Sequence, residues 1–90
     1  MQIKTLSKQQ LEILKYLYYH PNNNNIGISV AREMNVTYGS FSINCKMLKK
    51  QGLIYSKKVD GRSKKLFLTD KGKEIVRLYL KIEELLENGT

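Results

Sequence analysis

The sequence predicts a mainly helical fold with one small β-hairpin. Three apolar residues, Phe41, Cys45 and Leu48, recur at intervals of four and three, which is the spacing of side chains on one helix face. Gly52 then ends this helix, and two runs that favour extended chain follow, with the turn signal Asp60-Gly61 between them. A chain of 90 residues is expected to form one domain with a modest core.

The first helix is expected to begin after Ser7 and to run to about Tyr19. Ser7 can accept a hydrogen bond from a first-turn amide, and Gln10, three residues later, can reach back to the cap. Pro21 and the asparagines at 22–25 end the helix, because the residue before proline disfavours helix and asparagine favours turns.

This first helix has more apolar surface than one packing face needs. One stripe consists of Leu11, Leu14, Leu17 and Tyr18. Ile13 and Tyr16 place further apolar surface on another side of the same helix. We therefore expect this helix to have a second packing partner, such as another copy of the chain.

Residues 26–37 predict a short strand, a two-turn helix and a tight corner. Ile26 is expected to form the strand, and the helix is expected at 28–34 with three inward residues, Val30, Ala31 and Met34. Asn35 tolerates the left-handed conformation that such a corner demands, and Thr37 is a good cap for the next helix.

The remaining chain is expected to form a helix at 38–51, strands at 53–57 and 65–69, and a last helix at 70–88. Thr69 or Asp70 can cap this last helix. Four of its apolar residues follow the spacing of a coiled-coil seam, and they are Ile75, Leu78, Ile82 and Leu85. Tyr79 and Leu86 widen this apolar stripe. The helix either covers its own domain or forms a dimer, and the surplus apolar surface of the first helix favours the dimer.

The positive charge of the chain is concentrated in one segment. The net charge is +8, and residues 46–65 alone carry eight basic residues against one acid, a balance of +7. Such a patch favours binding to nucleic acid, because its contacts with phosphates release bound counterions. Charge that served only solubility would be dispersed over the surface. A membrane surface is disfavoured because the patch falls on a predicted hairpin rather than on an amphipathic helix. A solvated cationic face without a partner is the plain alternative.

The sequence gives little support to an enzyme, a metal site or a redox switch. His20 has no ligand-spaced neighbour, and no phosphate-cradling glycine loop or catalytic pair is present, so we expect no cofactor and no metal. The single cysteine, Cys45, lies on the inward stripe and is expected to act as a small apolar residue. Without a signal-peptide core or a membrane-length apolar run, we expect a cytoplasmic, nucleoid-associated protein.

Three phrases of the chain carry a family resemblance. They are residues 30–37 (VAREMNVT), 48–54 (LKKQGLI) and 67–72 (FLTDKG). In this order, with a basic turn between the last two, they resemble the winged helix-turn-helix superfamily. The resemblance is greatest to its MarR-like branch and to small regulators of archaea and their viruses, and it covers nearly the whole of residues 1–90.

The resemblance implies a transcription regulator that binds double-stranded DNA as a two-fold dimer built from the terminal helices. It places the recognition helix, 38–51, in a major groove and the wing, 58–65, on the backbone or a minor groove. The chain is much shorter than typical MarR-like proteins, so we expect no small-molecule effector. Two alternatives remain: a winged-helix module that binds protein or RNA, and an architectural protein that coats DNA without sequence preference.

Candidate DNA-binding residues follow from the inward stripe of the recognition helix and from the basic hairpin. They are Tyr38, Gly39, Ser40, Ser42, Asn44, Lys46, Lys49, Lys50, Lys58, Arg62, Lys64 and Lys65. We expect Asn44 to make a two-pronged contact to adenine and Arg62 to enter a minor groove, with the lysines on phosphates. The candidate dimer interface comprises Ile13, Tyr16, Ile75, Leu78, Tyr79, Ile82, Leu85 and Leu86. For each polar residue the alternative is an ordinary exposed side chain.

Overall fold

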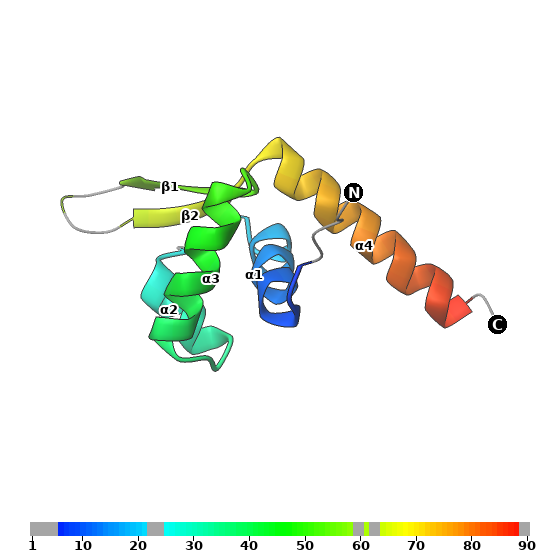
Figure 1. Ribbon diagram of the computed structural model, residues 1–90, viewed down its shortest axis with the longest axis horizontal. Coiled ribbons are helices and arrows are strands. Elements are labelled where there is room, and N and C mark those ends of the chain that lie inside the picture. The colour runs from blue at the N-terminus through cyan, green and yellow to red at the C-terminus, as the bar shows by residue number, and fades with distance from the viewer. Residues whose placement is uncertain (1–5, 22–24, 59–60, 62–63, 89–90) are drawn as a thin grey trace.

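The computed structural model describes residues 6–21, 25–58, 61 and 64–88. Its elements are α1 (Lys8–Tyr19), α2 (Gly27–Glu33), α3 (Tyr38–Lys50), β1 (Ile54–Lys58), β2 (Lys64–Leu68) and α4 (Asp70–Asn88). Three helices pack together in the middle of the molecule, and the hairpin and α4 extend from opposite ends of its longest axis (Figure 1). The predicted mainly helical fold with one hairpin is confirmed.

The start of α1 has the predicted capping box. The Ser7 hydroxyl accepts from the Gln10 backbone N–H at 3.2 Å, and the Gln10 side-chain oxygen accepts from the Ser7 N–H at 3.2 Å. These bonds satisfy two amide groups that the first helical turn leaves without partners. The capping box of Ser7 and Gln10 therefore determines where α1 begins.

The corner between α2 and α3 also forms as predicted. Asn35 adopts a left-handed conformation with φ 59°, and the Val36 N–H donates to the Ala31 carbonyl at 3.1 Å. The Thr37 hydroxyl then accepts from the Ser40 N–H at 3.3 Å and begins α3. The turn sets the direction in which α3 leaves the body of the domain.

The hairpin is antiparallel, with Ile54 opposite Leu68 and Lys58 opposite Lys64. Its first strand begins one residue later than predicted, because the Leu53 N–H closes the end of α3 by donating to the Leu48 carbonyl at 3.0 Å. This bond is typical of a helix end at which a glycine takes a left-handed conformation, and Gly52 has φ 76°. The predicted short strand at Ile26 is confirmed as a single bridge to Lys65.

Thr69, rather than Asp70, caps α4. Its hydroxyl accepts from the Gly72 N–H at 3.0 Å and donates to the Gly52 carbonyl at 2.7 Å. Gly72 lies against the backbone of Leu53, where a Cβ would have no room. The glycine in the phrase FLTDKG is thus required by close contact between α4 and the chain that follows α3.

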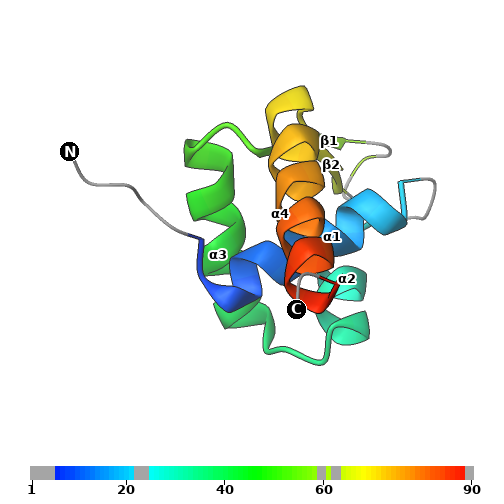
Figure 2. The same cartoon turned by 90° about the vertical axis from the view of Figure 1, so that its right-hand side faces the viewer.

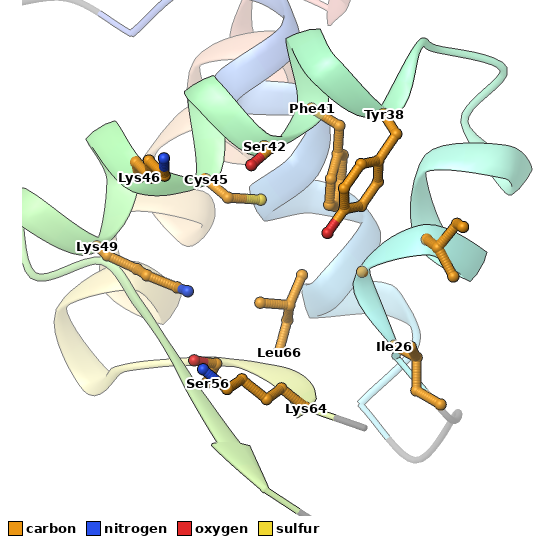
Figure 3. Close-up of a pocket in the computed structure, with 12 residues that line it drawn as sticks. Ile26, Tyr38, Phe41, Ser42, Cys45, Lys46, Lys49, Ser56, Lys64 and Leu66 are labelled. Atoms are coloured by element: carbon orange, nitrogen blue, oxygen red, sulfur yellow. The ribbon is translucent and has the colours of Figure 1, made fainter. Parts of the chain in front are cut away.

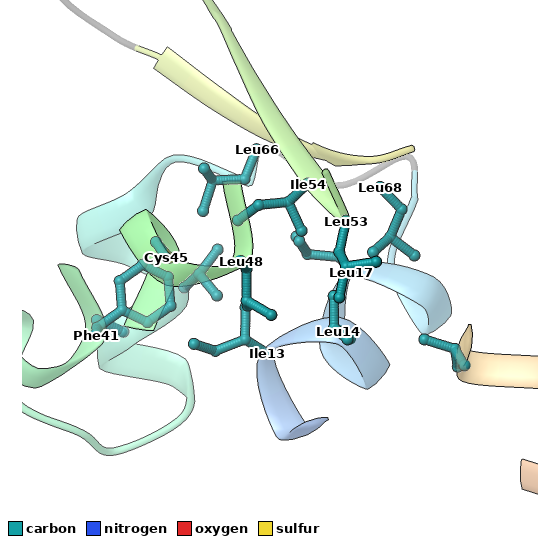
Figure 4. Close-up of a cluster of buried hydrophobic side chains, with 13 residues drawn as sticks. Ile13, Leu14, Leu17, Phe41, Cys45, Leu48, Leu53, Ile54, Leu66 and Leu68 are labelled. Carbon is teal, nitrogen blue, oxygen red and sulfur yellow. The ribbon is translucent and has the colours of Figure 1, made fainter. Parts of the chain in front are cut away.

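The core lies where α1, α3 and the hairpin meet (Figure 4). Ile13 is part of this core, is 0% exposed and lies beside Leu48. The prediction that Ile13 belongs to a dimer interface is therefore wrong. Because α1 lies between α3 and α4 (Figure 1) and contacts both, two of its sides face the interior, and Figure 2 shows it crossing behind α4. Its surplus apolar surface has partners within the chain.

Candidate nucleic-acid interface

The exposed side of α3 is opposite the stripe that enters the core. Phe41, Cys45 and Leu48 are buried as predicted. At 3.6 residues per turn, the opposite side carries a row of exposed residues that consists of Gly39, Ile43, Lys46 and Lys50. This outward row combines one open glycine, one apolar side chain and two cations.

A second side of α3 faces α1 and is engaged there. The Asn44 side-chain N–H₂ donates to Gln9 Oε1 at 2.8 Å, and Asn44 Oδ1 accepts from Gln10 Nε2 at 3.0 Å. The Ser40 hydroxyl donates to the same Gln9 oxygen at 3.2 Å. Met47 lies on this side too, with its sulfur 3.4 Å from Gln10 Nε2.

These bonds compete with the two-pronged contact to adenine predicted for Asn44, which stays a prediction. Such a contact needs both the donor and the acceptor of the amide, and both are used within the chain. Freeing them would cost about 0.5–1.5 kcal/mol per hydrogen bond. Ser40 is engaged in the same way. The glutamines of α1 are partners that helix geometry within α3 alone does not reveal.

The third side of α3 forms a groove with the hairpin and the start of α2. The groove has a volume of about 420 Å³. Phe41, Cys45 and Leu66 contribute apolar side chains to it, and Lys46, Lys49 and Lys64 contribute cations (Figure 3). Lys46 and Lys49 come from α3, whereas Lys64 comes from β2. The predicted cations of helix and hairpin thus border one surface.

Hydroxyl groups add polar partners to this groove. Tyr38, Ser42 and Ser56 all line it, and Tyr38 is stacked on Phe41 with ring centroids 6.4 Å apart. Tyr38 remains more than half exposed despite this contact. The groove therefore offers hydrogen-bonding groups between an apolar floor and a cationic rim.

The hairpin places lysines directly opposite one another. Lys57 pairs with Lys65 and Lys58 pairs with Lys64 in the strand register. Like charges in such positions destabilise a sheet, and a polyanion bound across them would relieve the repulsion. Lys65 is half-buried and the other three are exposed. The predicted minor-groove residue, Arg62, lies outside the described residues.

Cys45 contributes to the floor of the groove as a buried thiol. Burial raises the pKa of this thiol from 9.0 to about 11, although the nearby Lys49 charge opposes the shift. Since the thiolate is the reactive form, the thiol stays protonated and unreactive at neutral pH. The expectation that Cys45 acts as a small apolar residue agrees with this placement.

The other predicted dimer residues lie on or beside α4. Leu78, Ile82, Leu85 and Leu86 are exposed, whereas Tyr16, Ile75 and Tyr79 are half-buried. An ion pair of 2.9 Å between Lys15 and Glu83 ties α4 to α1. The distal part of α4 therefore presents an uncovered apolar stripe.

Within residues 6–21, 25–58, 61 and 64–88, no helix has the length and apolar character to cross a membrane. Over the same ranges, no three histidine, cysteine or carboxylate side chains gather as metal ligands would.

The corner, the helix that follows it and the basic hairpin define a winged helix-turn-helix protein. MepR, a transcription regulator of the Staphylococcus aureus multidrug efflux pump MepA, has the same fold. Its TM-score is 0.89 at 25% identity, over 93% of this chain and 62% of that one. MepR in complex with DNA gives a TM-score of 0.82 at 26% identity, over 92% and 61%. In its fold, the chain is therefore a MarR-like winged helix-turn-helix protein.

Lactococcus lactis ZitR shares the fold, with a TM-score of 0.81 at 21% identity over 93% of this chain and 63% of ZitR. The chain spans about three fifths of the length of these proteins. No protein-family model and no curated protein sequence matches it. A further MepR structure holds ethidium bromide, so the absence of a small-molecule effector here stays a prediction.

Proposed function

We propose that this protein is a sequence-specific regulator of transcription that binds double-stranded DNA as a homodimer. In this proposal α3 enters a major groove, and the hairpin lies on the adjacent backbone or minor groove. Operator occupancy that excludes other proteins would make it a repressor. MepR, which is similar over most of this chain, has been seen bound to DNA.

The observation that carries the proposal is the groove shared by α3 and the hairpin. Lys46 and Lys49 from the helix and Lys64 from β2 border the same surface. A recognition helix and a wing can contact one duplex only if they face the same side of the protein, as these do. The lysine pairs of the hairpin add charge where flanking phosphates would lie.

The structure changes which residues we propose as base readers. Ser40 and Asn44 are engaged with α1, so they are left out. Tyr38 and Ser42 remain as polar candidates on α3, and Gly39 leaves room for close approach. Lys46, Lys49, Lys50, Lys58, Lys64 and Lys65 are proposed to contact phosphates.

A homodimer is proposed because α4 exposes apolar residues along one stripe. Leu78, Ile82 and Leu85 are each at least half exposed, and they follow the spacing of a helix–helix seam. Pairing α4 with its copy would cover this stripe and present two recognition helices to successive major grooves. Half-sites would then be about 10 base pairs apart, or a multiple of that.

Selection of bound duplexes from a random pool tests this function. The proposal predicts enrichment of a palindrome whose half-sites follow that spacing. Enrichment of single-stranded or folded RNA over duplex DNA in direct competition would contradict it.

The second candidate is an architectural protein that binds duplex DNA without sequence preference. It is favoured because Asn44 and Ser40 are engaged within the chain while lysines dominate the exposed face. Footprinting separates the two functions, since a regulator protects a discrete site and an architectural protein protects DNA uniformly.

A further inference from the structure

Ile43 is the most exposed apolar side chain of the recognition helix. It lies in the middle of α3 and is 61% exposed. Phe41, Cys45 and Leu48 hold the opposite side of α3 in the core. At about 100° per residue, Ile43 projects almost directly away from that core.

The neighbours of Ile43 leave it uncovered. Gly39, one turn earlier in the outward row, has no side chain, and a Cβ built there would meet nothing within 4 Å. Lys46 and Lys50 follow in the same row and are exposed. Ile43 is therefore an apolar group in the middle of the outward row, between an opening and two cations, and this row adjoins the groove proposed to meet DNA.

Neither helix stability nor solubility accounts for isoleucine at this position. Its β-branched side chain has a lower helix propensity than alanine or lysine. Lone exposed apolar residues are common on protein surfaces. The position of Ile43 within the outward row of α3 is what gives it a specific meaning.

Base edges in the major groove present one prominent apolar group, the C5-methyl group of thymine. We propose that Ile43 is a specificity-determining residue that contacts thymine methyl groups, so that the preferred half-site has thymine opposite the centre of α3. This inference rests on the proposed function. The open space at Gly39 allows the helix backbone to approach the base edges closely enough for the contact.

The same contact would discriminate against RNA, because uracil lacks the methyl group. Lysine contacts to phosphates cannot make this distinction, since phosphates carry no base information. Ile43 would thus supply an apolar contribution to recognition that leaves the salt dependence of binding unchanged.

Deoxyuridine substitution tests the contact, because it removes only the methyl group from a thymine. In a duplex recovered by selection, each thymine of a half-site is replaced in turn, and the dissociation constant is measured for wild type and Ile43→Ala. We expect one thymine whose replacement weakens wild-type binding about fourfold, the fold-change that corresponds to about 0.8 kcal/mol for one buried CH₂ group. Ile43→Ala should be insensitive to that replacement.

Tyr19→Ala is the matched control. Tyr19 is another exposed apolar residue, 58% exposed, and it lies at the end of α1, outside both the groove and the outward row of α3. This variant should retain the full methyl sensitivity of wild type. Thermal unfolding of both variants should stay close to wild type, because neither side chain is in the core.

Three results would overturn the inference. The first is a preferred half-site without thymine, and the second is a wild type that is indifferent to every deoxyuridine. The third is Ile43→Ala with undiminished methyl sensitivity. Each of these would leave the proposed function standing, whereas failure to select any duplex would defeat both.

Discussion

The groove lysines should account for much of the salt dependence of DNA binding. Replacing Lys46, Lys49 and Lys64 with glutamine removes three positive charges that border one groove. A lysine that neutralises one phosphate contributes about 0.9 to the slope of log affinity against log salt. Three such contacts in each chain of a dimer therefore account for a slope of about 5.

This slope corresponds to a large effect on affinity. For a fourfold rise in salt concentration, wild-type affinity should fall about 1,000-fold more than the affinity of the triple variant. Fluorescence anisotropy of a labelled duplex, measured at several salt concentrations, gives both slopes.

A matched variant separates local contact from net charge. Lys73, Arg77 and Lys81 lie on α4, and their replacement with glutamine removes the same charge from another part of the molecule. This control should keep nearly the wild-type slope. If both triple variants lose the same slope, the reasoning from the groove is refuted, because only the total charge would matter.

The remaining predictions concern stability, reactivity and assembly. Gly72→Ala should lower the unfolding temperature by roughly 10 °C, since crowding the Leu53 backbone costs about 2 kcal/mol; Gly39→Ala, with open space, should not lower it. In native protein at pH 8, Cys45 should react far more slowly with iodoacetamide than in denaturant, and stability should fall as pH rises from 9 towards 11, because the folded thiol has the higher pKa. Ile82→Glu should give monomers in analytical ultracentrifugation, and an unchanged dimer would contradict the proposed seam.

Features set by neighbouring residues could be predicted from the sequence. Ser7 and Gln10 form their capping box three residues apart, and Asn35 and Thr37 shape the corner within a few residues. In each case the hydrogen-bond partners lie close together in the chain. The bounds of α1 and α3 followed because their caps are local.

Features set by distant contacts could not be predicted in this way. The sequence predicts Ile13 at a dimer interface, because helix periodicity reveals an apolar side without showing how many elements of the same chain cover it. Asn44 looked free because its partner Gln10 is 34 residues away. Ile43 is not among the residues predicted from the sequence, because that prediction considered only polar groups as base readers, although helix spacing alone places Ile43 opposite Phe41.

The central claim is that α3 and the hairpin together form the surface that binds duplex DNA. Titration of ¹⁵N-labelled protein with a selected duplex, followed by amide chemical shifts, tests it most directly. We predict that the largest changes fall on Tyr38–Lys50 and on the hairpin lysines Lys58 and Lys64, with smaller ones along the distal part of α4. Changes concentrated on α4, with α3 and the hairpin unaffected, would contradict the claim.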